Sequence, residues 1–179
     1  MVGFIFTEFI EMVENYFGYE TVDRILLSSE LDSNGIFTSA SSYPDSDFFK
    51  LIEQLSKEVD LNSYELEVDV GKYLFKSFLR RFAPVLEGVT DANGFITVMN
   101  NHFKTNFSKI YPNDKFGYIS LKTSENQLTV NYRTDNKLTN LIEGIILGSF
   151  EHYHDGVGMI KEDIKGDGRN VNFIIKLSR

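Results

Sequence analysis

Three histidines are the residues of this sequence most able to bind a metal or a cofactor. The first, His102, follows Phe95 by seven positions and Met99 by three, so a helix through this segment places it on their apolar face. A histidine buried there is either a core residue satisfied by a hydrogen bond or the nitrogen ligand of a heme iron in an aromatic-rich cavity. Periodicity alone does not decide between these two roles.

The other two histidines lie in the segment Glu151-His152-Tyr153-His154-Asp155, whose composition resembles that of a metal site. Residues two apart on a helix diverge by about 200°, so His152 and His154 cannot bind one ion while the segment is helical. Imidazoles at a helix C-terminus, where the dipole favours positive charge, are the simpler interpretation. A metal-dependent hydrolase that uses both histidines and Asp155 is the less favoured alternative.

The absence of cysteine removes whole classes of sites. Disulfides, thiolate-ligated and c-type heme, iron–sulfur clusters and cysteine-based zinc sites are all excluded. Any metal must therefore be held by nitrogen or oxygen. The triplet Gly166-Asp167-Gly168 predicts a hairpin turn rather than a phosphate-binding loop, because no helix follows it.

The charge balance restricts the partners that we expect. With 18 basic and 26 acidic residues, the chain has a net charge of -8, which disfavours nucleic acid and anionic membranes. Its apolar start lacks a basic region, and no run approaches the ~18 apolar residues of a membrane span. We therefore expect a cytoplasmic protein with no nucleic-acid or membrane partner.

Helical periodicity dominates the first half of the chain, and the 16 Phe and 9 Tyr predict an interior rich in aromatic rings. Gly18 is a candidate helix C-cap, and Asn62 or Ser63 is a candidate N-cap. The expected helices cover Phe4 to Phe17, Thr21 to Ser29, Asp45 to Val59, Ser63 to Phe82 and Asp91 to Tyr111.

After Tyr111 the period changes, and alternating segments predict two hairpins around a buried helix. The chain of 179 residues is predicted to form one α+β domain, 1–179, with a helical part of about residues 1–90. The remainder, about 91–179, holds one helix and an antiparallel β-β-α-β-β part. Its expected elements are strands Tyr118 to Lys122 and Leu128 to Tyr132, helix Leu138 to Tyr153, and strands Val157 to Ile164 and Val171 to Leu177.

Several short segments, in the same order, resemble the H-NOX family, the heme-nitric oxide/oxygen binding domains that include the sensor part of soluble guanylate cyclase. The resemblance covers essentially the whole chain and implies an H-NOX-like fold. The segments are Met1 to Phe9, Gly35 to Thr38 with Tyr43-Pro44-Asp45, Gly71 to Phe75, Leu86-Glu87-Gly88, Lys109 to Pro112, Tyr132 with its neighbours, and Glu143 to Ile146.

The resemblance implies a non-covalent heme b with a proximal histidine about thirty residues before a Tyr-x-Ser-x-Arg motif. His102 lies 30 residues before Tyr132 and is therefore the expected iron ligand. Counting back from Ile110-Tyr111-Pro112 instead gives Lys104, a hydrated cation that does not suit the role. Choosing His102 assumes a two-residue length difference in this segment.

The motif that holds the heme propionates in the family is altered in this sequence. Tyr132 keeps the tyrosine, Thr134 keeps a hydroxyl in place of serine, and Asn136 replaces the arginine. The bidentate guanidinium–carboxylate pair is thereby lost, which weakens the expected retention of heme. Arg133 or Lys137 could replace it from a neighbouring position.

The distal side of the implied heme pocket is apolar. By alignment Ile5, Leu74, Phe78 and Ile145 line it, and Leu141 stands where oxygen-binding members carry a tyrosine. Bound O₂ needs a hydrogen-bond donor, whereas NO and CO do not, so the pattern favours NO and CO over O₂.

The resemblance implies a sensor rather than an enzyme. We expect NO to bind a ferrous heme on His102, with signalling in trans to a separate protein such as a histidine kinase or a cyclic-nucleotide enzyme. The alternative is a heme-poor H-NOX-like interaction module whose aromatic-lined apolar cavity holds another ligand or none.

Overall fold

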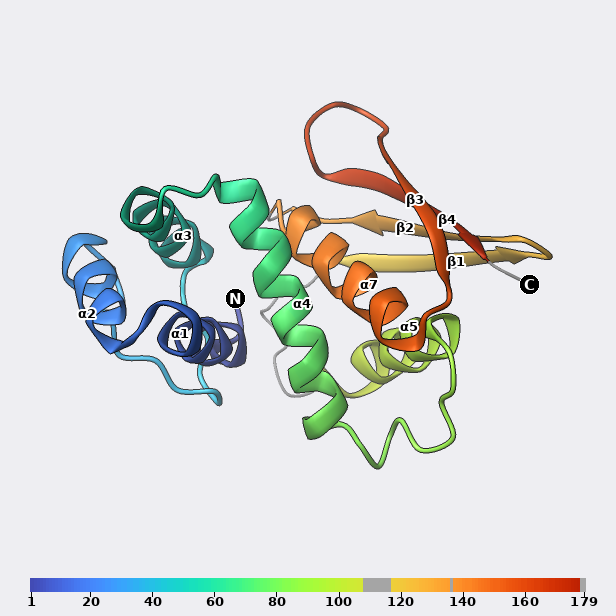
Figure 1. The fold of residues 1–179 in the computed structure, drawn as a ribbon, viewed down its shortest axis with the longest axis horizontal. Helices are drawn as coiled ribbons and strands as arrows, with labels where there is room; N and C mark the ends of the chain where they lie inside the picture. The colour runs from blue at the N-terminus through green and yellow to red at the C-terminus, as the bar shows by residue number, and fades with distance from the viewer. Residues whose placement is uncertain (108–116, 136, 178–179) are drawn as a thin grey trace.

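A computed structural model describes residues 1–107, 117–135 and 137–177 of the chain. Helices come first and a sheet with one further long helix follows, which confirms the predicted α+β class (Figure 1). The elements in chain order are α1 (Gly3–Phe17), α2 (Tyr19–Ser28), α3 (Asp45–Val59), α4 (Ser63–Arg81), α5 (Ala92–His102), the π-helical turn η1 (Phe103–Phe107), β1 (Tyr118–Ser124), β2 (Gln127–Arg133), α7 (Thr139–Tyr153), β3 (Gly156–Asp163) and β4 (Asn170–Leu177).

The helix predicted from Asp91 to Tyr111 differs from the structure at its end. It begins as expected, because the Asp91 side chain accepts a hydrogen bond from the Gly94 N–H at 2.6 Å and caps α5. The α-helical part ends at His102, and the next turn, η1, is a wider π-turn. The predicted residues beyond Phe107 lie outside the described residues.

The sheet has four antiparallel strands in the order β1-β2-β4-β3. Alternate residues of the two central strands, among them Val130 and Tyr132 on β2 and Phe173 on β4, are fully buried. One face of the sheet therefore packs on the protein interior, as alternation predicts. Helix α7 packs against α4 and α5 on the interior side (Figure 1).

Helices α4 and α7 cross in backbone contact. A methyl group added at Gly71 of α4 would lie 2.7 Å from the Cα atom of Gly144 of α7, and one added at Gly144 would lie 2.8 Å from the Gly71 Cα atom. No larger residue fits at either position without separating the helices. The two glycines thus fix how closely α7 approaches the helical half of the molecule.

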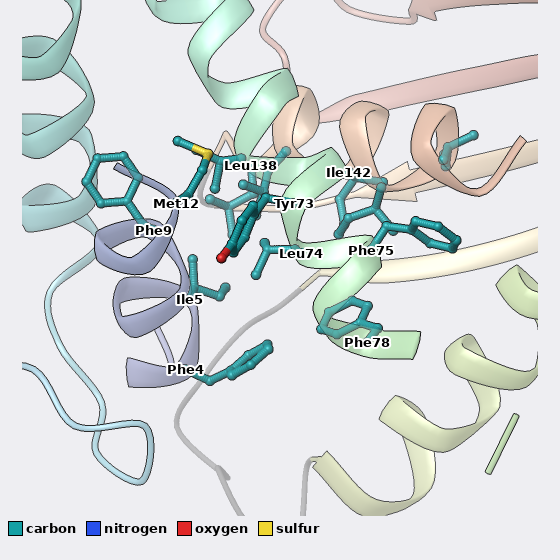
Figure 2. Close-up of a cluster of buried hydrophobic side chains, with 14 of the residues drawn as sticks. Phe4, Ile5, Phe9, Met12, Tyr73, Leu74, Phe75, Phe78, Leu138 and Ile142 are labelled. Atoms are coloured by element: carbon teal, nitrogen blue, oxygen red, sulfur yellow. The ribbon is translucent and has the colours of Figure 1, made fainter. Parts of the chain in front are cut away.

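Helices α1, α2 and α3 form a separate layer on the other side of α4 (Figure 1). The Phe6 ring lies at its centre, with its centroid 4.5 Å from that of Phe37 and 6.0 Å from that of Phe48. Apolar side chains of α1, including Phe4 and Ile5, point toward α4 (Figure 2). The N-terminal layer is thereby joined to α4 through a continuous apolar core.

Candidate functional site

A cavity of about 300 Å³ lies among α4, α5, α7 and the first two strands. Its size is at the lower end of the range for small-molecule sites, and most of its wall is aliphatic or aromatic. The lining residues are Phe78, Phe95, Ile96, Met99, Asn100, Phe103, Lys104, Gly117, Tyr118, Ile119, Val130, Ile142, Ile145 and Ile146.

The α5 side of the wall is one helical stripe that continues into η1. Its members, Phe95, Ile96, Met99, Asn100 and Phe103, are spaced as neighbours on one helix face. At 100° per residue, His102 lies roughly 90° from the centre of this stripe. It is half-buried on the flank of the helix, where its ring centroid lies 5.1 Å from that of Phe82. The structure therefore brings Phe103, rather than His102, to the cavity.

How well heme fits the cavity depends on which side-chain atoms of the wall could bind its iron. Among the described wall residues, the side-chain nitrogens belong to Asn100 and Lys104, and the Lys104 Nζ lies 4.8 Å from the centre of the Tyr118 ring. Neither the Asn100 amide nor the Lys104 amine is a usual axial ligand of heme iron, whereas imidazole is. The wall fits the apolar body of a tetrapyrrole, and His102 lies beside it on the flank of α5, next to the lining residue Phe103.

The predicted distal residues separate into two groups. Phe78 and Ile145 line the cavity, whereas Ile5, Leu74 and Leu141 are fully buried in the core beside it. Figure 2 shows Ile5 and Leu74 between α1 and α4. On α7 the cavity is lined by Ile142 rather than its neighbour Leu141. Because α7 is apolar on nearly all faces, periodicity could not show which face lines the cavity.

The first two residues of the propionate motif are brought together at the end of β2. Tyr132 and Thr134 are both buried; burial raises the pKa of the Tyr132 hydroxyl, and a hydrogen bond with the Thr134 side chain opposes this rise. Gly117 lies directly against the Tyr132 ring, because a Cβ atom there would be 2.5 Å from Tyr132 Cε2. The third motif residue, Asn136, lies outside the described residues.

An open groove adjoins the cavity at Gly117 and Tyr118. Its other sides are the end of β2 and the turn between β3 and β4. It brings together three cationic side chains, Arg133, Lys165 and Arg169. The sequence analysis named Arg133 or Lys137 as a replacement for the propionate arginine. It did not name Lys165 or Arg169, since nothing in the local pattern places the β3–β4 turn beside β2.

The C-terminal histidines do not share a site. His154 ends α7 in the left-handed conformation, and the His152 ring packs on Phe75 with a centroid distance of 5.5 Å. Asp155 accepts a hydrogen bond from the Ala92 N–H at 2.7 Å and so ties α5 to the end of α7. Within the described ranges, no three His, Asp or Glu side chains are grouped to hold a metal, and no helix is long and apolar enough to cross a bilayer.

Comparisons with known proteins identify the fold. A family model described as Haem-NO-binding (HNOB) matches residues 2–160. The unliganded Fe(II) H-NOX protein from K. algicida is 31% identical, with a TM-score of 0.88 over 100% of this chain and 97% of that chain. The Fe(II)NO form of an H-NOX protein from S. oneidensis has 19% identity and a TM-score of 0.87, with both chains covered to 100%. Among curated proteins, no match is found.

These matches confirm the resemblance that the sequence segments indicate. The S. oneidensis protein shares the fold, and the K. algicida protein adds sequence identity over the full length. Since the family model also spans most of the chain, this protein belongs to the H-NOX family.

Proposed function

We propose that this chain is a heme-based gas-sensor domain that holds the tetrapyrrole in the cavity among α4, α5, α7 and the sheet. The observation that carries the proposal is this apolar cavity, found in a member of a family whose solved representatives include Fe(II), Fe(II)NO and Fe(II)CO forms. When bound, heme supplies an iron that takes a diatomic gas. The signal then passes in trans to a partner such as a histidine kinase or a cyclic-nucleotide enzyme.

The wall supports a preference for NO and CO over O₂. Ile142, Ile145 and Ile146 of α7 and Phe78 of α4 offer no hydrogen-bond donor to a bound gas. Bound O₂ requires such a donor. Asn100 is the buried amide in the described part of the wall, so a stable O₂ complex that disappears in Asn100→Leu would contradict this preference.

The absorption spectrum of protein expressed with a heme precursor tests the proposal. We expect a heme band in stoichiometric amount, and spectral shifts with NO and CO after reduction. Protein that takes up no heme, even after reconstitution with hemin, would contradict the proposal. Gas titration of the loaded protein then ranks NO, CO and O₂.

The axial ligand is tested by a pair of adjacent substitutions. If His102 is the ligand, His102→Gly loses heme and added imidazole restores it. If ligation instead requires an imidazole at the position of Phe103, which lines the cavity, Phe103→His increases heme affinity and gives a histidine-ligated spectrum, while His102→Gly changes nothing. The proposed sensor function expects the first result, because His102 is the histidine of α5, the helix that lines the cavity.

A second candidate function is an interaction module that binds little heme. It is favoured by the presence of Phe103 and Lys104, rather than an imidazole, in the cavity wall. The two functions differ in one experiment, because the module predicts that wild-type protein lacks heme and that Phe103→His acquires it. Heme uptake by the wild-type chain equal to that of Phe103→His would exclude the module.

A further inference from the structure

We infer that Asn34 is a site of spontaneous deamidation, at which the side-chain amide is converted to aspartate and isoaspartate in the folded protein. The chain contains two Asn-Gly dipeptides, Asn34-Gly35 and Asn93-Gly94. Both have a sequence that favours the reaction, because glycine has no side chain to hinder its main-chain nitrogen. The structure places the two dipeptides in opposite environments, so only the first is expected to react. The inference does not depend on the cavity or on heme.

The reaction at Asn34 needs only the chain and water. The main-chain nitrogen of Gly35 attacks the side-chain carbonyl carbon of Asn34, a new C–N bond forms, and the bond from that carbon to the side-chain nitrogen breaks. The proton of the Gly35 N–H passes through solvent to the leaving group, which departs as ammonia. Water then opens the resulting succinimide ring at one of its two carbonyls. One opening gives aspartate, and the other gives isoaspartate, in which the main chain runs through the side-chain methylene group.

Asn34-Gly35 lies in a turn between α2 and α3. Asn34 is exposed and has a φ of +56°, and Gly35 follows with a φ of +72°. Asn-Gly is the preferred pair where two consecutive residues of a turn are left-handed, so the backbone conformation accounts for this sequence. Within the described part of the chain, the Gly35 N–H donates no hydrogen bond. The attacking nitrogen is therefore available in the folded protein.

Asn93-Gly94 lies in the first turn of α5 and is held there. The Gly94 N–H donates to the Asp91 carboxylate at 2.6 Å, and the Ala92 N–H donates to the Asp155 carboxylate at 2.7 Å. Asn93 itself is half-buried. Attack by the Gly94 nitrogen thus requires the charge-assisted cap to break and the end of the helix to open.

The turn at Asn34 is attached to the core of the N-terminal layer through the two residues that precede it. The N–H groups of Asp32 and Ser33 donate to the buried Asp47 carboxylate at 3.1 Å and 2.9 Å. Aspartate at position 34 keeps the length of the main chain and tolerates the left-handed conformation. Isoaspartate lengthens the main chain by a methylene group directly after Ser33, which should displace both donors. Isoaspartate should therefore destabilise the layer more than aspartate does.

Peptide mapping by mass spectrometry follows both asparagines in one molecule. The full chain is incubated at physiological temperature and neutral pH, and the conversion of amide to acid is measured at each site. We expect Asn34 to react at least about tenfold faster than Asn93, since a hydrogen bond to a charged group must break before Gly94 can attack. In urea sufficient to unfold the chain, the two rates should become similar.

Asn34→Asp is the matched control, because it carries the aspartate product from the start. It should show no conversion of amide to acid at position 34. Isoaspartate is detected by methyl transfer from S-adenosylmethionine with an isoaspartyl methyltransferase. Label should accumulate at position 34 of the wild type and more slowly in Asn34→Asp, because a carboxylate is a poorer electrophile than an amide. The isoaspartate fraction, separated by ion exchange, should unfold at a lower urea concentration than Asn34→Asp.

Three outcomes would contradict these expectations. Equal rates at Asn34 and Asn93 in the folded chain, or a faster reaction at Asn93, overturn the inference. So does an unchanged Asn34 in the folded protein over a period in which the unfolded chain reacts at both sites. An isoaspartate fraction that unfolds at the same urea concentration as Asn34→Asp overturns the proposed effect on the contacts with Asp47.

Discussion

The N-terminal layer and the cavity region are built from the same kinds of side chain but pack them differently. Around Phe6, rings from α1, α3 and the intervening segment close on one another, with Phe37, Tyr43 and Phe48 as neighbours. Around the cavity, Phe78 and Phe103 also contact each other, at 5.5 Å, yet they border a space of about 300 Å³. Aromatic content alone therefore does not indicate a binding site. A binding site forms only where the side chains of facing elements leave a space between them.

Truncation of one aromatic ring in each region should give the largest difference between the two regions in the loss of free energy of unfolding. We expect Phe6→Ala to lower the free energy of unfolding by about 3–5 kcal/mol, because it leaves a cavity in a fully packed core. Phe103→Ala, at a half-buried residue beside an existing space, should cost about 1–2 kcal/mol. Urea unfolding measures both, and equal losses would show that the cavity region is as closely packed as the layer.

Two aspartates that each accept backbone hydrogen bonds provide the next comparison. Asp47 is fully buried in the N-terminal layer and accepts from the N–H groups of Asp32 at 3.1 Å and Ser33 at 2.9 Å. We expect Asp47→Ala to cost about 1–3 kcal/mol, since these donors lose a buried charged acceptor. Asp163→Ala, at an exposed turn, should cost less. Urea unfolding at neutral pH ranks the two variants.

The loss at Asp47 should depend on pH. Burial raises the pKa of this carboxyl, but the hydrogen bonds from Ser33 and Asp32 and the charge of Lys50 outweigh burial and lower it overall. The stabilisation is therefore complete above the unfolded-state pKa of about 3.9 and is lost as the pH falls through the lower folded-state value. Asp47→Asn should show a smaller, pH-independent loss, and a pH-independent difference for Asp47→Ala would contradict this account.

The smallest effect concerns Glu67, on the side of α4 that faces α7 and β3. Burial raises the pKa of its carboxyl, against the opposing hydrogen bond from Asn140 at 3.1 Å and the charge of Lys161. A raised folded-state pKa means that stability falls as the pH rises above about 4.3, the unfolded-state value. Glu67→Gln should remove this decline and stabilise the protein at neutral pH by up to about 1 kcal/mol, as measured by urea unfolding across pH 4–8.

The sequence predicted most elements of both regions because their signals are local. Asn62 caps α4 as predicted, with its side chain accepting from the Glu65 N–H at 2.9 Å, and Gly18 ends α1. The two hairpins follow from alternation of apolar and polar residues, which the buried face of β2 reproduces. Such signals do not depend on knowing which elements meet.

The candidate site was harder to predict, for a reason visible at η1. A π-turn closes on the fifth residue rather than the fourth, so it contains one residue more than an α-turn. Regular α-helical periodicity gives no sign of this extra residue, so the sequence did not point to Phe103, which lines the cavity. The groove was missed because only the fold brings Arg169 beside Thr134.

The glycine crossing of α4 and α7 has a mechanical consequence. Side chains can absorb a small displacement by changing rotamer, but two backbones in contact cannot, so α4 must follow any shift of α7 at Gly144. On its other side α4 carries Tyr73, whose hydroxyl donates to Glu11 of α1 at 2.8 Å and accepts from Asn15 at 3.0 Å. A ligand that displaces Ile145 of α7 therefore also displaces α4, a helix about 28 Å long. Through Tyr73, this displacement reaches α1.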